Sequence, residues 1–110
     1  MERAAVNLIG IWIADKSDMR TISELGDVLL EFDKDGCLAY VVRLEDRKQI
    51  IKLRYRIDGD VIETDQPSAP RIERTAFSLF DDEVLTLSFG GIPYRFIRGR
   101  TSECEFDRVG

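Results

Sequence analysis

The chain has 110 residues, of which 16 are Lys or Arg and 21 are Asp or Glu, so its formal net charge is −5. This length holds one folded core but not two, and 44% hydrophobic with 34% charged residues is typical of a globular domain. The absence of histidine excludes Ser-His-Asp and Cys-His catalytic sites and histidine-ligated metal sites, and the acidic balance argues against binding to nucleic acid.

We expect a single domain over 1–110, with its core within about residues 8–99. The two cysteines, Cys37 and Cys104, lie far apart and form no Cys-x-x-Cys pair, so the sequence predicts unpaired thiols and no structural zinc site. Met1 to Ile9 is not an apolar leader, and no apolar run approaches the roughly 20 residues that span a bilayer. A cytoplasmic domain without metal, cofactor or membrane association is the expectation.

The first predicted element is the apolar run Leu8 to Ala14. Both faces of this run are hydrophobic, so we expect a strand that lies between the core and a covering element or second sheet. Asp18 to Leu25 follows, with apolar residues three positions apart, Ser17 or Asp18 as a candidate N-cap, and Gly26 as a stop. This second segment predicts a short helix or helical turn.

The rest of the chain alternates between strand-like runs and turn residues. Asp35-Gly36 and Asp58-Gly59 are tight hairpin signals, and the prolines within Gln66 to Pro70 interrupt the sheet. Counting the first run, about eight strands in hairpin order predict an all-β antiparallel meander barrel, since closure removes exposed strand edges. The remaining expected strands are Val28 to Phe32, Cys37 to Leu44, Ile50 to Ile57, Val61 to Asp65, Ile72 to Phe80, Val84 to Phe89 and Ile92 to Arg98.

Two short motifs add to this order of elements. Gly10-Ile11-Trp12 on the first strand and Tyr94 to Arg98 on the last, with the helical turn and the hairpins between them, resemble the lipocalin-like group of the calycins. The resemblance covers about Leu8 to Gly99. It implies a small barrel, but the chain is short and lacks a long C-terminal helix. The resemblance therefore leaves open whether the barrel holds a ligand or is filled by its own side chains.

The resemblance also implies a role for individual residues. In that family a tryptophan closes one end of the barrel and an arginine of the last strand packs over it, which assigns the first role to Trp12. Arg98 is expected to be the arginine because it shares a face with Phe96, and Arg95 is the alternative. Such a contact stabilises by about 0.5 to 2 kcal/mol.

Aromatic residues suggest a ligand site. Tyr40, Tyr55 and Tyr94 are expected on the inward faces of three different strands, where each buried hydroxyl needs a partner. The candidate ligand contacts are therefore these three tyrosines, Phe96 and Arg98, on the condition that the hydroxyls converge with Arg98 on a shared interior space. Such a space would suit a small amphipathic molecule that bears a carboxylate.

Several charged motifs have simpler interpretations. Glu31 to Gly36 resembles the opening of a calcium loop, but Val42 stands where the loop needs a bidentate Glu, so we expect a turn. Asp81-Asp82-Glu83 is expected to be an exposed turn rather than a catalytic carboxylate pair.

One strand carries a stripe of cations, Lys52, Arg54 and Arg56. The stripe could bind an anion. The simpler interpretation is a solvated outer face paired with Glu31, Glu63 or Glu73.

Three function classes remain. The leading hypothesis is non-catalytic binding of a small hydrophobic or amphipathic ligand inside the barrel. The second is an acidic protein-interaction module, such as an inhibitor, an immunity-type partner or a homodimer. The third is a histidine-free enzyme acting through Tyr, Arg and a buried acid, which we disfavour because no acid is expected on an inward strand face.

Overall fold

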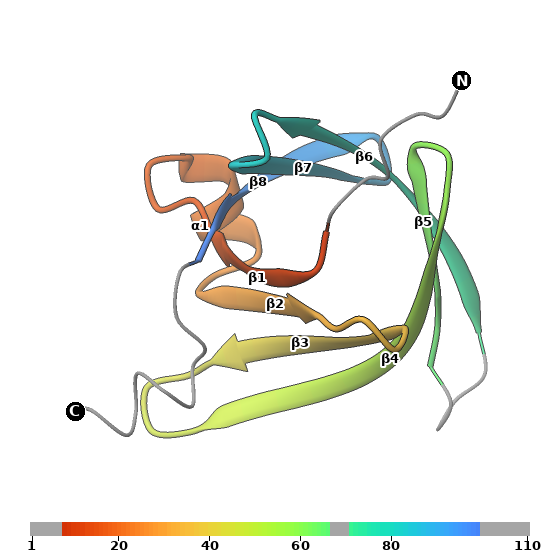
Figure 1. The fold of residues 1–110 in the computed structure, drawn as a ribbon. Helices are drawn as coiled ribbons and strands as arrows, with labels where there is room; N and C mark the ends of the chain where they lie inside the picture. Colours follow the sequence, from red (N-terminus) through yellow and green to blue (C-terminus); the bar gives the residue numbers. More distant parts are fainter. Residues whose placement is uncertain (1–7, 67–70, 100–110) are drawn as a thin grey trace.

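A computed structural model describes residues 8–66 and 71–99 of the chain. All strands belong to one closed antiparallel barrel in which each strand pairs with its sequence neighbours and β1 also pairs with β8 (Figure 1). The predicted eight-stranded meander barrel with one short helix after the first strand is confirmed. The predictions for Pro67, Pro70 and Cys104 concern residues outside the described ranges. The elements are β1 (Gly10–Ala14), α1 (Met19–Glu24), β2 (Val28–Phe32), β3 (Cys37–Arg43), β4 (Lys48–Asp58), β5 (Val61–Asp65), β6 (Ile72–Phe80), β7 (Val84–Phe89) and β8 (Ile92–Arg98).

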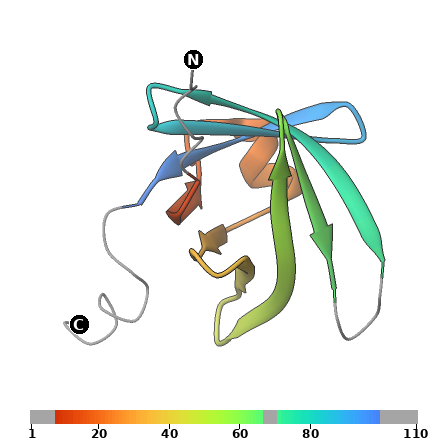
Figure 2. The ribbon, with the colours of Figure 1, turned by 45° about the vertical axis from the view of Figure 1, so that its right-hand side comes forward.

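Strand β4 is longer than the sequence predicts. It starts at Lys48 because the turn after β3 is tight, with the amide of Leu44 donating to the carbonyl of Arg47 at 2.8 Å. The polar residues Lys48 and Gln49, which precede the predicted strand Ile50 to Ile57, therefore extend the ladder with β3. Figure 2 shows that β4 curves along its length, so that it forms part of two sides of the barrel wall.

The barrel interior is filled unevenly. On β1, β2, β7 and β8 most inward side chains are almost fully buried, and Trp12, Phe32 and Phe96 are the largest of them. On β4 the inward side chains remain partly exposed, although the alternation places them on the same inner face. This side of the interior is therefore not filled by the protein's own side chains. The β4 residues are Ile51, Leu53, Tyr55 and Ile57.

The outer face of the barrel carries a second apolar cluster. Ile11, Leu29 and Val41 alternate with inward residues yet are only 7%, 2% and 6% exposed. The prediction that the first strand is deeply placed is thus confirmed for Ile11, Trp12 and Ala14, whereas neither a second sheet nor another covering element is seen within the described residues.

The cross-strand register extends this outer cluster into a row. Directly paired outward positions run from Ile50 through Val41, Leu29, Ile13, Ile97 and Val84 to Phe80. Phe80 is 69% exposed and Ile97 is 40% exposed. An apolar row on the outside of a barrel is unusual, since outward positions are expected to be polar.

Helix α1 is anchored to β8 through Thr21, which is fully buried. The Thr21 hydroxyl donates to the carboxylate of Asp18 at 2.8 Å and accepts from the backbone N–H of Arg95 at 2.9 Å. Asp18 occupies the N-cap position as predicted, but its carboxylate bonds this hydroxyl instead of a helix amide. Within the described residues, no helix has the length and apolar character needed to cross a membrane.

Replacing Thr21 with Val should lower the free energy of unfolding by about 1 to 3 kcal/mol, because the amide of Arg95 and the carboxylate of Asp18 lose their partner in a buried place. Urea denaturation followed by circular dichroism measures this change. Thr86→Val on the outer face of β7 is the matched control and should change the stability by less than about 0.5 kcal/mol. Equal effects of the two substitutions would show that the hydroxyl of Thr21 does not anchor the helix.

Candidate functional site

One end of the barrel is closed by Trp12. Its ring is completely buried, and its indole N–H donates to the carbonyl of Leu8 at 3.0 Å. Trp12 is paired with Arg98 across the β1–β8 ladder, which is where the barrel closes. A buried indole with its polar atom satisfied is a stable plug.

Arg98 lies over this plug. The centre of its guanidinium is 4.1 Å from the centroid of the Trp12 ring, its Nε donates to the carbonyl of Asp82 at 3.1 Å, and its Nη1 donates to the carbonyl of Ile9 at 2.9 Å. Gly10 leaves room for this contact, since a Cβ there would lie 3.1 Å from Nη1 and its φ of 126° disfavours other residues. Arg95 points outward, as β8 alternates, and its Nε lies 3.7 Å from Asp15.

The acidic turn between β6 and β7 takes part in this closed end through its backbone. Asp81 and Asp82 have positive φ values of 54° and 57°, and the amide of Glu83 donates to the carbonyl of Phe80. These dihedrals define a hairpin turn of type I′. The prediction of an exposed turn is confirmed, and the carbonyl of Asp82 rather than a carboxylate binds Arg98.

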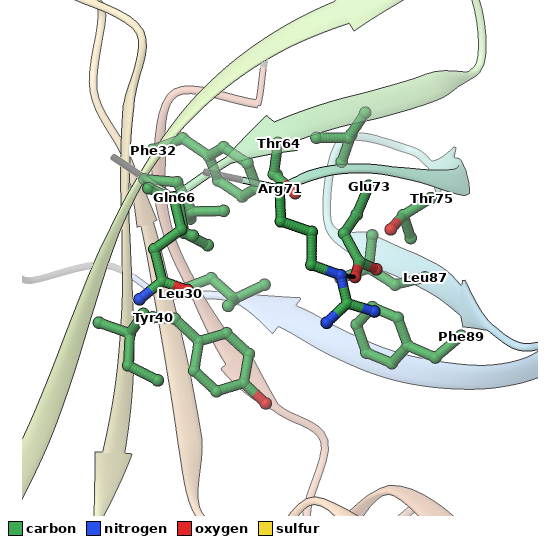
Figure 3. A pocket seen from close by; sticks show the side chains of 14 residues that line it. Leu30, Phe32, Tyr40, Thr64, Gln66, Arg71, Glu73, Thr75, Leu87 and Phe89 are labelled. Carbon is green, nitrogen blue, oxygen red and sulfur yellow. Dashed lines mark ion pairs between the residues drawn. The ribbon is translucent and has the colours of Figure 1, made fainter. Parts of the chain in front are cut away.

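The opposite part of the barrel contains a cavity of about 320 Å³. Its deep wall consists of apolar side chains from β2, β3, β4, β5 and β7. Its mouth carries polar side chains from β5, from β6, from the residues that directly follow β5 and precede β6, and from Tyr40 of β3 (Figure 3). The apolar lining is Leu30, Phe32, Leu38, Ile51, Leu53, Ile62, Leu87 and Phe89, and the polar lining is Tyr40, Thr64, Gln66, Arg71, Glu73 and Thr75.

An ion pair between Arg71 and Glu73 lies at the mouth of the cavity. Nε of Arg71 lies 2.8 Å from Oε2 of Glu73, and the side chains are 78% and 52% exposed. Figure 3 shows both groups turned toward the space between Tyr40 and Phe89. The cavity therefore combines an apolar interior with a charged but balanced rim.

The prediction that no acid lies on an inward strand face is wrong. Glu73 lies on the inward face of β6 and lines the cavity, where it pairs with Arg71, so it is not the one of the three proposed acids that pairs with the outer cations. The signal was in the sequence: Thr75, Phe77 and Leu79 share the parity of Glu73, and a strand of period two places all of them on one face. The apolar residues Ile72 and Ala76 lie on the exposed outer face of β6, so hydrophobicity alone did not identify the inward face.

The tyrosine hydroxyls do not converge, so the condition for a site shared with Arg98 is not met. Tyr55 donates to the carbonyl of Asp33 at 2.7 Å near the β2–β3 turn, and Tyr94 donates to Oε1 of Glu24 on α1 at 2.5 Å. Tyr40 lines the cavity, where its hydroxyl has no partner among the described residues. The reason is that alternation decides the face of the sheet but not the position along the barrel axis.

The other two predicted ligand contacts lie elsewhere. Phe96 is completely buried in the core, and Arg98 belongs to the closed end. Of the five proposed contact residues, only Tyr40 is in the cavity wall, whereas Arg71 and Glu73 were missed.

All three tyrosines have raised pKa values. Burial raises the pKa of Tyr40 and, together with the negative charges of Asp33 and Cys37, that of Tyr55. The hydrogen bond to Glu24, followed by burial and the charge of Glu24, raises the pKa of Tyr94. The phenols therefore stay protonated at neutral pH and act as hydrogen-bond groups rather than as bases.

The cationic stripe of β4 lies on the outer face as expected. Arg56 donates to Glu63 at 2.8 Å, and Glu63 also accepts from Arg74, which in turn contacts Asp58 at 3.2 Å. The hydrogen bond from Arg56 is the largest of the effects that lower the pKa of Glu63. The pairing with Glu63 is thus confirmed, and this network is a solvated surface feature of small energetic value.

The segment that resembles a calcium loop is the turn between β2 and β3. The carboxylate of Asp33 accepts from the backbone amides of Asp35 and Cys37 at 2.8 and 2.9 Å, so it already stabilises the turn. Within the described residues, no group of three or more Cys, Asp or Glu side chains could hold a metal ion.

The chain was compared with known proteins. A scan against protein-family models finds no match, and a search of curated proteins finds no relative. The cavity and the closed end are therefore the features from which a function has to be inferred.

Arg98→Lys should lower the free energy of unfolding by about 1 to 3 kcal/mol, because a lysine cannot stack on Trp12 while donating to two separate carbonyls. Because Trp12 is the single tryptophan of the chain, its fluorescence emission should also move to longer wavelength in the folded variant. Urea titration and emission spectra measure both effects. Arg95→Lys is the control and should leave the emission unchanged, and a similar shift in both variants would contradict the assignment.

Proposed function

We propose that the protein is a lipocalin-like binding protein that holds a small amphipathic molecule in its barrel cavity without chemically changing it. The single observation that carries this proposal is the cavity of about 320 Å³ with apolar walls and a polar mouth. Small-molecule sites have this character, with volumes of roughly 300 to 1,000 Å³ and a few polar groups that orient the ligand.

The lining supports a definite orientation of the ligand. An apolar body gains about 0.8 kcal/mol for each CH₂ group it buries against side chains such as Leu38, Leu53 and Ile62. The polar end remains at the mouth. The hydroxyl of Tyr40, which has no partner among the described residues, and the hydroxyls of Thr64 and Thr75 offer hydrogen bonds there.

Two further observations support a non-catalytic role in the cytoplasm. The raised pKa of Tyr40 keeps the one phenol of the cavity neutral, so it cannot serve as a base at neutral pH. The cytoplasmic location is inferred from the sequence, whose two distant cysteines do not form the dense framework typical of small secreted domains.

Filling the cavity should abolish binding. The uncharged fluorescent probe N-phenyl-1-naphthylamine is expected to bind the protein with enhanced emission, and Ile51→Trp should weaken this binding at least about tenfold because the indole occupies the cavity. Lys52→Trp places the same indole on the outer face of the neighbouring position and should leave the affinity within about twofold. Absence of probe binding to the unmodified protein, or equal loss in both variants, would contradict the proposal.

The outer apolar row favours a second candidate function, self-association of two copies. Phe80, Val84 and Ile97 are neighbours on the outer face, and exposed apolar residues in contact with one another mark interaction surfaces. Sedimentation equilibrium tests this candidate: a dimer that Phe80→Asp converts to monomer supports it. A monomer at about 100 μM excludes self-association of biological strength.

A further inference from the structure

The rim of the cavity carries one positive and one negative side chain. Each has hydrogen-bonding atoms that their mutual ion pair does not use. Nε of Arg71 is directed to Oε2 of Glu73, and within the described residues this carboxylate is the one partner of the guanidinium. The terminal N–H groups of Arg71 and the second oxygen of Glu73 therefore remain available. Both groups are turned toward the cavity (Figure 3).

These open positions discriminate between ligand charges. A head group with a single charge is attracted by one member of the pair and repelled by the other at a similar distance, so the two effects largely cancel. A head group that carries both charges satisfies both members at once. The terminal fork of an arginine binds a carboxylate through two parallel hydrogen bonds, and an ammonium group donates to the free carboxylate oxygen.

The surroundings of the pair fit a compact head group joined to an apolar body. Glu73 is paired with Thr64 across the β5–β6 ladder, and Thr75 lies two positions further along β6, so hydroxyl groups flank the carboxylate. Leu53, Ile62 and Leu87 line the space below. An apolar chain can therefore extend inward while the charges stay at the mouth.

We propose that the cavity binds a zwitterionic amphipath, namely a small α-amino acid with an apolar side chain or a molecule with the same adjacent ammonium and carboxylate groups. This inference rests on the proposed function, since it names the ligand class of the same cavity. Arg71 holds the carboxylate, and Glu73 both orients Arg71 and accepts from the ammonium group.

A matched set of ligands tests the proposal by isothermal titration calorimetry at pH 7 with the full chain. The set is 2-aminooctanoic acid, octanoic acid, which lacks the ammonium group, heptylamine, which lacks the carboxylate, and 1-octanol, which carries no charge. We expect 2-aminooctanoic acid to bind at least about tenfold more tightly than octanoic acid or heptylamine.

Charge variants of the pair give a second readout. Arg71→Gln should weaken binding of 2-aminooctanoic acid and strengthen binding of heptylamine, because it leaves Glu73 as the unopposed charge. Glu73→Gln should have the opposite effect and strengthen binding of octanoic acid. Arg74→Gln, at an adjacent outward position, is the control and should leave the order of affinities unchanged.

The outcomes separate the two proposals. If none of the four compounds binds the unmodified protein, the proposed function is contradicted together with this inference. If octanoic acid, heptylamine or 1-octanol binds as tightly as 2-aminooctanoic acid, the cavity is a ligand site but the zwitterion preference is wrong. A loss of affinity for all compounds in both charge variants would show that the pair supports the structure of the mouth rather than selecting charge.

Discussion

The contact between Arg98 and Trp12 is the interaction on which the architecture depends. The first and last strands lie far apart in the sequence and yet pair with each other, so among the described strands their ladder carries the longest loop closure. Arg98 secures that ladder from three directions, through the indole ring, the carbonyl of Ile9 and the carbonyl of Asp82. Without the ladder between them, β1 and β8 would both be exposed edges of an open sheet.

Closing one end with large side chains makes the barrel asymmetric. Trp12, Phe32 and Phe96 fill one part of the interior, whereas the curved strand β4 leaves its inward side chains partly exposed in another. The helix secures its own side of the barrel, because Thr21 and Glu24 bond the backbone and side chain of β8. The remaining opening, at β3, β5 and β6, is where a molecule can enter.

The polar residues of the interior fall into two groups. Some hydrogen-bond other parts of the protein, and others keep hydrogen-bonding atoms that a ligand could use. Tyr55 and Tyr94 use their hydroxyls to tie a turn and the helix to the barrel, so neither has capacity left for a ligand in its donor role. Within residues 8–66 and 71–99, Tyr40, Arg71 and Glu73 retain open hydrogen-bonding positions beside the cavity. The distinction follows from where each residue lies along the barrel axis, and not from its type or its face.

Local pattern in the sequence determined the strand order, the short helix and the positions of the turns, because period-two alternation and turn chemistry act between residues close in sequence. The roles of Trp12 and Arg98 were implied by the resemblance to lipocalin-like barrels, and the structure shows the two residues in contact. The tertiary structure alone decided that the barrel is partly hollow, that Glu73 and Arg71 meet at its mouth, and that the tyrosines separate. Cavity volume and axial position depend on strand tilt, curvature and the packing of side chains from opposite walls, and no short segment of sequence encodes those quantities.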